Sequence, residues 1–157
     1  MEKLREIKIE KAGFGGLIKN IREGVKAARE LPELEKQLQD ARDTQDSTKK
    51  RNEERQRQYD VAQKQYDVAV KTYGENSKEA QLAKNRLGIA EAYLILSNEE
   101  VKNGEEQITN LSEQVRIAKL QKKLANSSIS EMLSTASAVG DSISNLHGAL
   151  TDVFGEL

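Results

Sequence analysis

The feature that most constrains this chain is a series of apolar residues that recur at alternating spacings of three and four. The series begins at Ala80 and ends at Leu157, and its non-apolar members are Ser97, Gly104 and Lys122. This spacing returns side chains to one face of an α-helix, and it is the pattern by which helices pack in coiled coils. We call these positions the seam. A seam of this length predicts helix and argues against disorder.

The seam also continues upstream in the same register, from Tyr73 back to Leu31, but its middle is polar. Residues 42–58 contain no apolar residue. One interpretation is a solvated helical stretch that contributes little to packing. The other is a polar seam that weakens the bundle at a chosen place, because polar seam residues lower stability but can fix the register.

The segment between the two parts of the seam carries the residues of a turn. Gly74 stands where a helix C-cap is expected, and Asn76 followed by Glu79 resembles an N-cap arrangement, with Ser77 beside it. These residues predict a helical hairpin with its turn near 74–77. The seam is unbroken across the turn, so one continuous helix is the alternative.

Other residues predict interruptions in the helices. Pro32 is the only proline, and a break near residues 30–32 is expected because proline disrupts a helix interior. The sequence of residues 126–131 resembles a capping box, and Asn103–Gly104 is a second weak point. We therefore expect the helices to be kinked or interrupted in these places.

The predicted fold class is all-α: an elongated coiled coil, built as a long helical hairpin with extra helices at both ends. Residues 1–30 form an amphipathic N-terminal helix. Residues 31–126 form the hairpin coiled coil. Residues 127–157 form an acidic, apolar helix rich in Ser, Ala and Gly. Folding near the turn pairs positions whose numbers sum to about 151.

The candidate interaction residues are the large apolar members of the seam. They are Leu87, Leu94, Val101, Ile108, Leu111, Val115, Ile129, Met132, Val139, Ile143, Leu146, Leu150 and Val153.

The composition points away from catalysis. The chain has no cysteine and one histidine, His147, and its carboxylates are spread among lysines and arginines as on solvated helix faces. No catalytic, cofactor-binding or metal-binding residue is expected, and the protein is not predicted to be an enzyme. The net charge of −1 argues against nucleic-acid binding. No apolar run reaches the length of about 18 residues that spans a membrane.

Two passages resemble phage tail tape measure proteins. One is residues 31–94, especially the turn sequence of residues 73–80, which is preceded by the Lys/Gln/Glu-rich helix of residues 34–38. The other is residues 130–154, with leucines spaced by Ala, Gly and Ser. The resemblance implies a helical protein packed in several copies inside a tail tube. Its partners would be the tail tube and assembly chaperones, and it would be assembled in the host cytoplasm into the virion tail.

This chain is shorter than such proteins and lacks their membrane-active and peptidoglycan-cleaving parts, so it would be a fragment or a short relative. We therefore expect a structural coiled-coil protein that self-assembles. The alternatives are a cytoplasmic helical-hairpin interaction module, such as an adaptor or an inhibitor, and a membrane-active protein that uses its apolar C-terminal segment.

Overall fold

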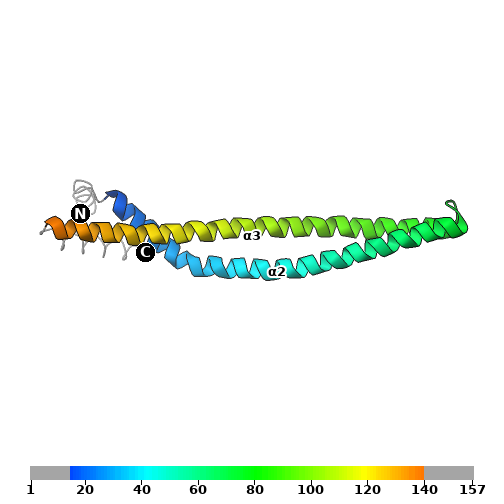
Figure 1. Cartoon of the computed structure of the whole chain (residues 1–157), viewed down its shortest axis with the longest axis horizontal. Coiled ribbons are helices and arrows are strands. Elements are labelled where there is room, and N and C mark those ends of the chain that lie inside the picture. Colours follow the sequence, from blue (N-terminus) through cyan, green and yellow to red (C-terminus); the bar gives the residue numbers. More distant parts are fainter. Residues whose placement is uncertain (1–14, 140–157) are drawn as a thin grey trace. The chain divides into compact units, whose positions relative to one another are not determined.

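The computed structural model describes residues 15–139, and their side chains up to residue 135. These residues form two helices, α2 (Gly15–Tyr73) and α3 (Lys78–Val139), joined by a turn at residues 74–77 (Figure 1). The described part of the chain contains no strand. The prediction of an all-α helical hairpin is therefore confirmed for the described residues, and in this structure they do not form one continuous helix.

The turn is closed by Gly74 and Ser77. Gly74 has a φ of +92°, and its N–H donates to the carbonyl of Val70 at 2.9 Å. Both features are those of a glycine that ends a helix, as predicted for Gly74. The hydroxyl oxygen of Ser77 accepts the N–H of Ala80 at 3.1 Å, so Ser77 is the N-cap of α3. The prediction of Asn76 as the N-cap is wrong, because the capping oxygen comes from the following residue.

Helix α2 is not broken near residues 30–32. It runs unbroken from Gly15 to Tyr73 with Pro32 inside it, so the predicted break is wrong. An interior proline loses one backbone hydrogen bond and costs about 3 kcal/mol. Leu31 and Leu34 are half-buried on either side of the proline, and this packing offsets part of that cost.

Helix α3 is likewise unbroken through the two places where interruptions were expected, residues 103–104 and 126–131. Both predictions are wrong. The serine and glycine residues there lie against α2 instead: Ser128 is buried and Gly104 is half-buried. Small residues in a helix interior can mark a close helix–helix contact as well as a helix end.

The described residues fall into two compact units. The first unit combines residues 15–37 of α2 with residues 111–139 of α3, and the second comprises residues 38–110. In the first unit Ile21 and Met132 are fully buried and pack against a ring of half-buried apolar residues, which are Leu17, Ile18, Val25 and Ile129.

The core of the second unit is thinner. Its buried apolar residues are Leu38, Ala41, Ala62, Ala69, Ala80 and Leu94, and most of these are alanines. Burial stabilises roughly in proportion to the apolar area removed from water, at about 25 cal/mol per Å². A core made mainly of methyl groups therefore stabilises this unit only weakly.

Candidate helix–helix interaction surfaces

The seam of the second unit lies between its two helices. Every seam position from Leu38 to Ala69 on α2 and from Ala80 to Ile108 on α3 is buried or half-buried. The two seam positions at the turn, Tyr73 and Asn76, are exposed. The packed face of each helix in this unit therefore follows the alternating spacing of three and four.

The polar middle of the seam contains a buried glutamine. Gln45 is 3% exposed, and its Nε2 donates to the backbone carbonyl of Val101 at 2.8 Å. Its Oε1 is buried and has no hydrogen-bond partner among the described residues. Gly104 leaves the space for this side chain, because a Cβ there would lie 1.9 Å from Oε1. Gly104 is thus a packed seam position, although Asn103–Gly104 was predicted to be a weak point of the helix.

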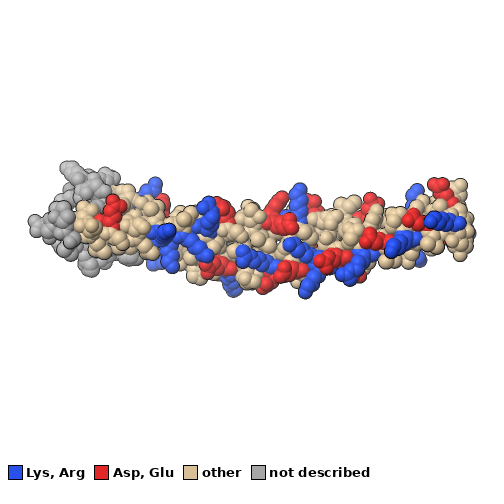
Figure 2. Space-filling view, in the orientation of Figure 1, with Lys and Arg blue, Asp and Glu red and all other residues tan. Residues whose placement is uncertain are grey.

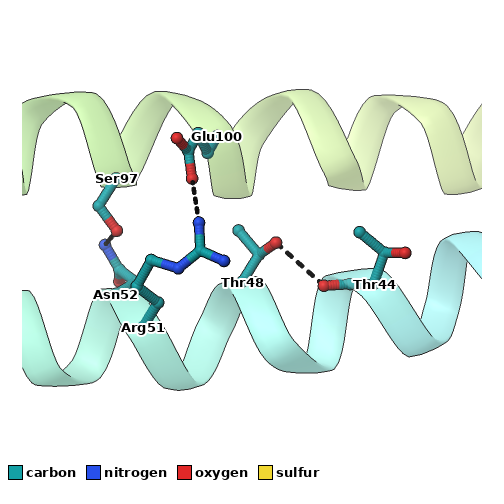
Figure 3. A network of polar contacts seen from close by, with 6 residues as sticks. All are labelled: Thr44, Thr48, Arg51, Asn52, Ser97 and Glu100. Atoms are coloured by element: carbon teal, nitrogen blue, oxygen red, sulfur yellow. Dashed lines mark hydrogen bonds and ion pairs between the residues drawn. The ribbon is translucent and has the colours of Figure 1, made fainter.

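Further cross-helix contacts follow along the polar stretch (Figure 3). Asn52 donates through Nδ2 to the hydroxyl of Ser97 at 3.2 Å and to Oδ1 of Asn98 at 2.7 Å. Arg51 forms an ion pair with Glu100 at 3.4 Å. These contacts place residues 42–58 opposite 93–109, as expected from folding at the turn.

Two other seam residues of this stretch are satisfied in different ways. Thr48 turns its hydroxyl to the carbonyl of Thr44 on its own helix, at 2.9 Å. The guanidinium of Arg55 lies 4.4 Å from the ring centre of Tyr93, a cation–π contact between the helices. Residues 42–58 therefore contact α3 through polar side chains, as a polar seam does, and the expectation that this stretch weakens the bundle stays a prediction.

Gln45 and Gly104 are expected to be energetically coupled. Gly104→Ala should lower the free energy of unfolding by about 1 kcal/mol, because the new methyl group displaces the buried amide and its hydrogen bond. In a Gln45→Ala background the same change should raise the free energy of unfolding by about 1 kcal/mol, because only the helix propensity of alanine remains. Urea unfolding of the four proteins in this double-mutant cycle measures the coupling. Equal effects of Gly104→Ala in both backgrounds would contradict the contact.

The first unit is held by a close approach of the two helices at Gly24. A Cβ at Gly24 would lie 2.1 Å from the Cβ of Ala125 and 2.7 Å from the backbone oxygen of Gln121. Next to this contact, Nδ2 of Asn20 donates to the hydroxyl of the buried Ser128 at 3.4 Å. The contact joins small residues, and Gly24 is not a position of the predicted seam.

The seam of α3 departs from its predicted register within this unit. Ala118, Ala125 and Met132 are buried as expected, but Lys122, a predicted member, is exposed. Gln121 is half-buried in its place. The contact with Gly24 explains the change, because it brings the side of α3 that carries Gln121 toward α2 and leaves the lysine charge in water.

The predicted interaction residues that the structure describes lie at or near the helix–helix contacts. Leu94, Leu111, Val115 and Met132 are buried, and Leu87, Val101, Ile108 and Ile129 are half-buried. Val139 ends α3, and its side chain is not described. The remaining predicted residues, Ile143, Leu146, Leu150 and Val153, lie outside the described residues.

A second line of apolar residues in the second unit faces solvent. We call it the outer strip; it consists of Val61 and Val68 on α2 and of Leu82, Ile89 and Leu96 on α3. Each residue directly precedes a buried or half-buried seam residue, and their exposed fractions run from 52% to 63%. Equivalent heptad positions of two antiparallel helices lie on the same side of the pair, because a twofold axis perpendicular to the helices relates one helix to the other. The outer strip therefore forms one face.

Charges are mixed along both helices rather than gathered into one patch. Figure 2 shows Lys and Arg alternating with Asp and Glu on the face in view. Arg57 pairs with Glu53 and Glu54 within α2. In α3, the hydrogen bond from Nε of Arg116 to Oε2 of Glu113, at 3.0 Å, holds the pKa of that carboxyl below its usual value. Both groups are exposed, as in surface pairs that contribute little stability.

The described residues offer no arrangement for catalysis or metal binding. No three His, Cys, Asp or Glu residues come together in this part of the chain in a way that could hold a metal ion. A shallow groove of about 390 Å³ in the first unit has Leu34, Ile117 and Ala118 among its lining, with Glu30 and Glu33 also lining it. Neither α2 nor α3 has a stretch apolar and long enough to cross a membrane.

Comparison with known proteins gave no matching family model, no matching curated protein and no matching solved structure.

Proposed function

We propose that this chain is a structural coiled-coil protein that acts by assembling with further copies of itself, and that it is not an enzyme. The outer strip carries this proposal. Five large apolar side chains lie more than half exposed on one face of the second unit. A row of exposed apolar side chains of this kind is expected where another protein packs.

The pattern of the two helices supports packing against more helices. A helix of a simple two-stranded coiled coil is apolar at two positions in seven. Here Val61, Val68, Leu82, Ile89 and Leu96 add a third position next to the seam. These residues stand outside the seam, so they leave apolar surface that a two-stranded pair does not cover. The thin alanine core of the second unit also favours further association, because a hairpin alone buries little apolar area.

The resemblance of residues 73–80 and 130–154 to tape measure proteins supplies the proposed setting. In that setting the chain is a segment or short relative of a tape measure protein, assembled in several copies into a virion tail in the host cytoplasm. Its further partners are the tail tube and the assembly chaperones. Self-assembly itself does not depend on this setting, because the outer strip requires only a helical partner.

Self-assembly through the outer strip is tested by placing charges on it. Ile89→Lys combined with Leu96→Lys should weaken self-association at least about tenfold, because two apolar side chains, each worth about 1 to 2 kcal/mol when buried, are replaced by charges. Sedimentation equilibrium gives the association constant, and circular dichroism checks that helicity is unchanged.

The control variant is Gln81→Lys combined with Asn85→Lys, which adds the same charge to exposed polar positions of the same helix. It should associate like the unaltered chain. If both variants associate equally well, the outer strip is not the assembly surface. An unaltered chain that stays monomeric at every concentration would instead leave the monomeric interaction module as the function.

A further inference from the structure

We propose that the seam of α3 packs against α2 of a second copy of this chain. The turn at residues 74–77 opens into helix, and two chains exchange arms to form an antiparallel dimer of continuous helices. This inference rests on the proposed function, since it names the way in which the copies pair. It concerns the second unit, residues 38–110, where both arms and the turn are described.

The seam keeps one register across the turn. The steps from Tyr73 to Asn76 and from Asn76 to Ala80 continue the alternation of three and four without a break. A hairpin does not require this, because its turn lets α3 begin in any register relative to α2. An unbroken register arises by chance about once in seven, since a heptad has seven positions. A continuous helix does require it.

The hairpin leaves the seam positions at its turn exposed to solvent. Between residues 38 and 108 every seam position is buried or half-buried except Tyr73 and Asn76. Tyr73 is 60% exposed in the hairpin although it occupies a core position of the pattern. The hairpin thus leaves unused the two seam residues that a continuous helix would place on its packed face.

The cross-helix pairs of the hairpin are arranged symmetrically about the turn. Gln45 with Gly104, and Asn52 with Ser97, lie at equal sequence distances on either side of a centre between residues 74 and 75. In an exchanged dimer that centre becomes a twofold axis. The same pairs then form between the two chains, and the relation places Tyr73 against Asn76 of the second copy. Every seam contact of the hairpin is kept, and the turn positions gain contacts.

The turn itself is held by few interactions. Ser77 donates its N–H and its hydroxyl to the carbonyl of Gly74, at 3.2 and 2.7 Å. These bonds and the N-cap bond from the Ala80 N–H to the Ser77 hydroxyl are lost on opening. The continuous helix replaces them with helical backbone bonds but must accommodate Gly74, Asn76 and Ser77, which are weak helix formers. Exchange of identical elements between copies needs little free energy when the contacts are the same in both forms. Protein concentration then decides between hairpin and dimer.

The test uses a pair of cysteines in the full-length chain, Asn52→Cys with Ser97→Cys. The two side chains are in contact, with Nδ2 of Asn52 3.2 Å from Oγ of Ser97, and the chain has no other cysteine. Oxidation in the hairpin closes the disulfide within one chain. Oxidation in the exchanged dimer links two chains, which then migrate together on a non-reducing denaturing gel. Sedimentation of the same sample gives the mass before denaturation.

Three results are distinguishable. Assembled protein with disulfides between chains supports the exchange. Assembled protein with every disulfide inside one chain overturns the exchange and leaves the proposed self-assembly standing. Protein that is monomeric at all concentrations, with the disulfide inside the chain, overturns both. Circular dichroism of the oxidised and reduced protein verifies that the cysteine pair has left the helices intact.

Turn variants give a second, independent readout in the same cysteine background. Gly74→Ala should raise the fraction of interchain disulfide roughly tenfold or more at low concentration, because alanine disfavours the φ of +92° and favours helix. Insertion of three glycines after Glu75 should abolish it, because the insertion lengthens the turn and breaks the seam register. Equal interchain fractions in these two variants would overturn the proposal.

Discussion

Replacing Gly24 with alanine is expected to lower the free energy of unfolding by about 2 kcal/mol. The added Cβ would lie 2.1 Å from the Cβ of Ala125 and 2.7 Å from the backbone oxygen of Gln121. Carbon atoms in good contact lie about 3.5 to 4.0 Å apart, so the two helices must separate. Overpacking of this kind costs about 1 to 3 kcal/mol and exceeds the gain in helix propensity. Urea unfolding followed by circular dichroism measures the change.

The matched control is Gly88→Ala, a change of the same chemistry in the interior of α3. A Cβ at Gly88 would meet nothing within 4 Å. The substitution should therefore raise the free energy of unfolding by about 0.5 to 1 kcal/mol through helix propensity alone. The two variants are predicted to differ in sign. Stabilisation by Gly24→Ala would show that the helices do not approach each other closely at this residue.

Leu111→Asp is expected to have the largest effect, a loss of about 3 to 4 kcal/mol in the free energy of unfolding. Leu111 is 8% exposed on the packed face of α3, and the substitution places a carboxylate there without a partner. Gln114→Asp, three residues along on an exposed position, should change the free energy of unfolding by only about 0.5 kcal/mol. Thermal unfolding of both variants measures the contrast. Similar losses in the two would mean that the seam register is wrong here.

The pairing of the two helices in the second unit could be predicted from the sequence. Gly74 marks the turn, and the spacing of three and four marks the face that packs. Together they place the polar residues 42–58 opposite 93–109, where Gln45 and Asn52 are found to bond to Val101 and Ser97. The spacing carries this information because it depends on helix geometry alone.

The register after Ala118 could not be predicted in the same way. Both Lys122 and Gln121 lie three or four residues from Ala118 and from Ala125, so either one completes the pattern. The choice depends on how α2 approaches, and that depends on Gly24, whose role is apparent only when Ala125 is seen against it. From the sequence alone, a glycine within a helix indicates only weak helix propensity. Its role in a close contact becomes apparent when the partner helix is known.

The predicted interruptions at Pro32 and Gly104 were wrong for a related reason. Local propensity predicts interruption at both, yet α2 and α3 continue through them. Gly104 is required by the side chain of Gln45, a residue far away in the sequence, and Pro32 lies between the half-buried Leu31 and Leu34. Tertiary packing overrides propensity at such positions.

The mass of the unaltered chain in solution tests most directly whether this is an assembling structural protein. Sedimentation equilibrium across a wide range of concentrations should show a mass that rises from the monomer value of 17.5 kDa toward a multiple of it. Self-association through exposed apolar surface predicts this dependence on concentration. A mass that stays at 17.5 kDa at every concentration would contradict the account.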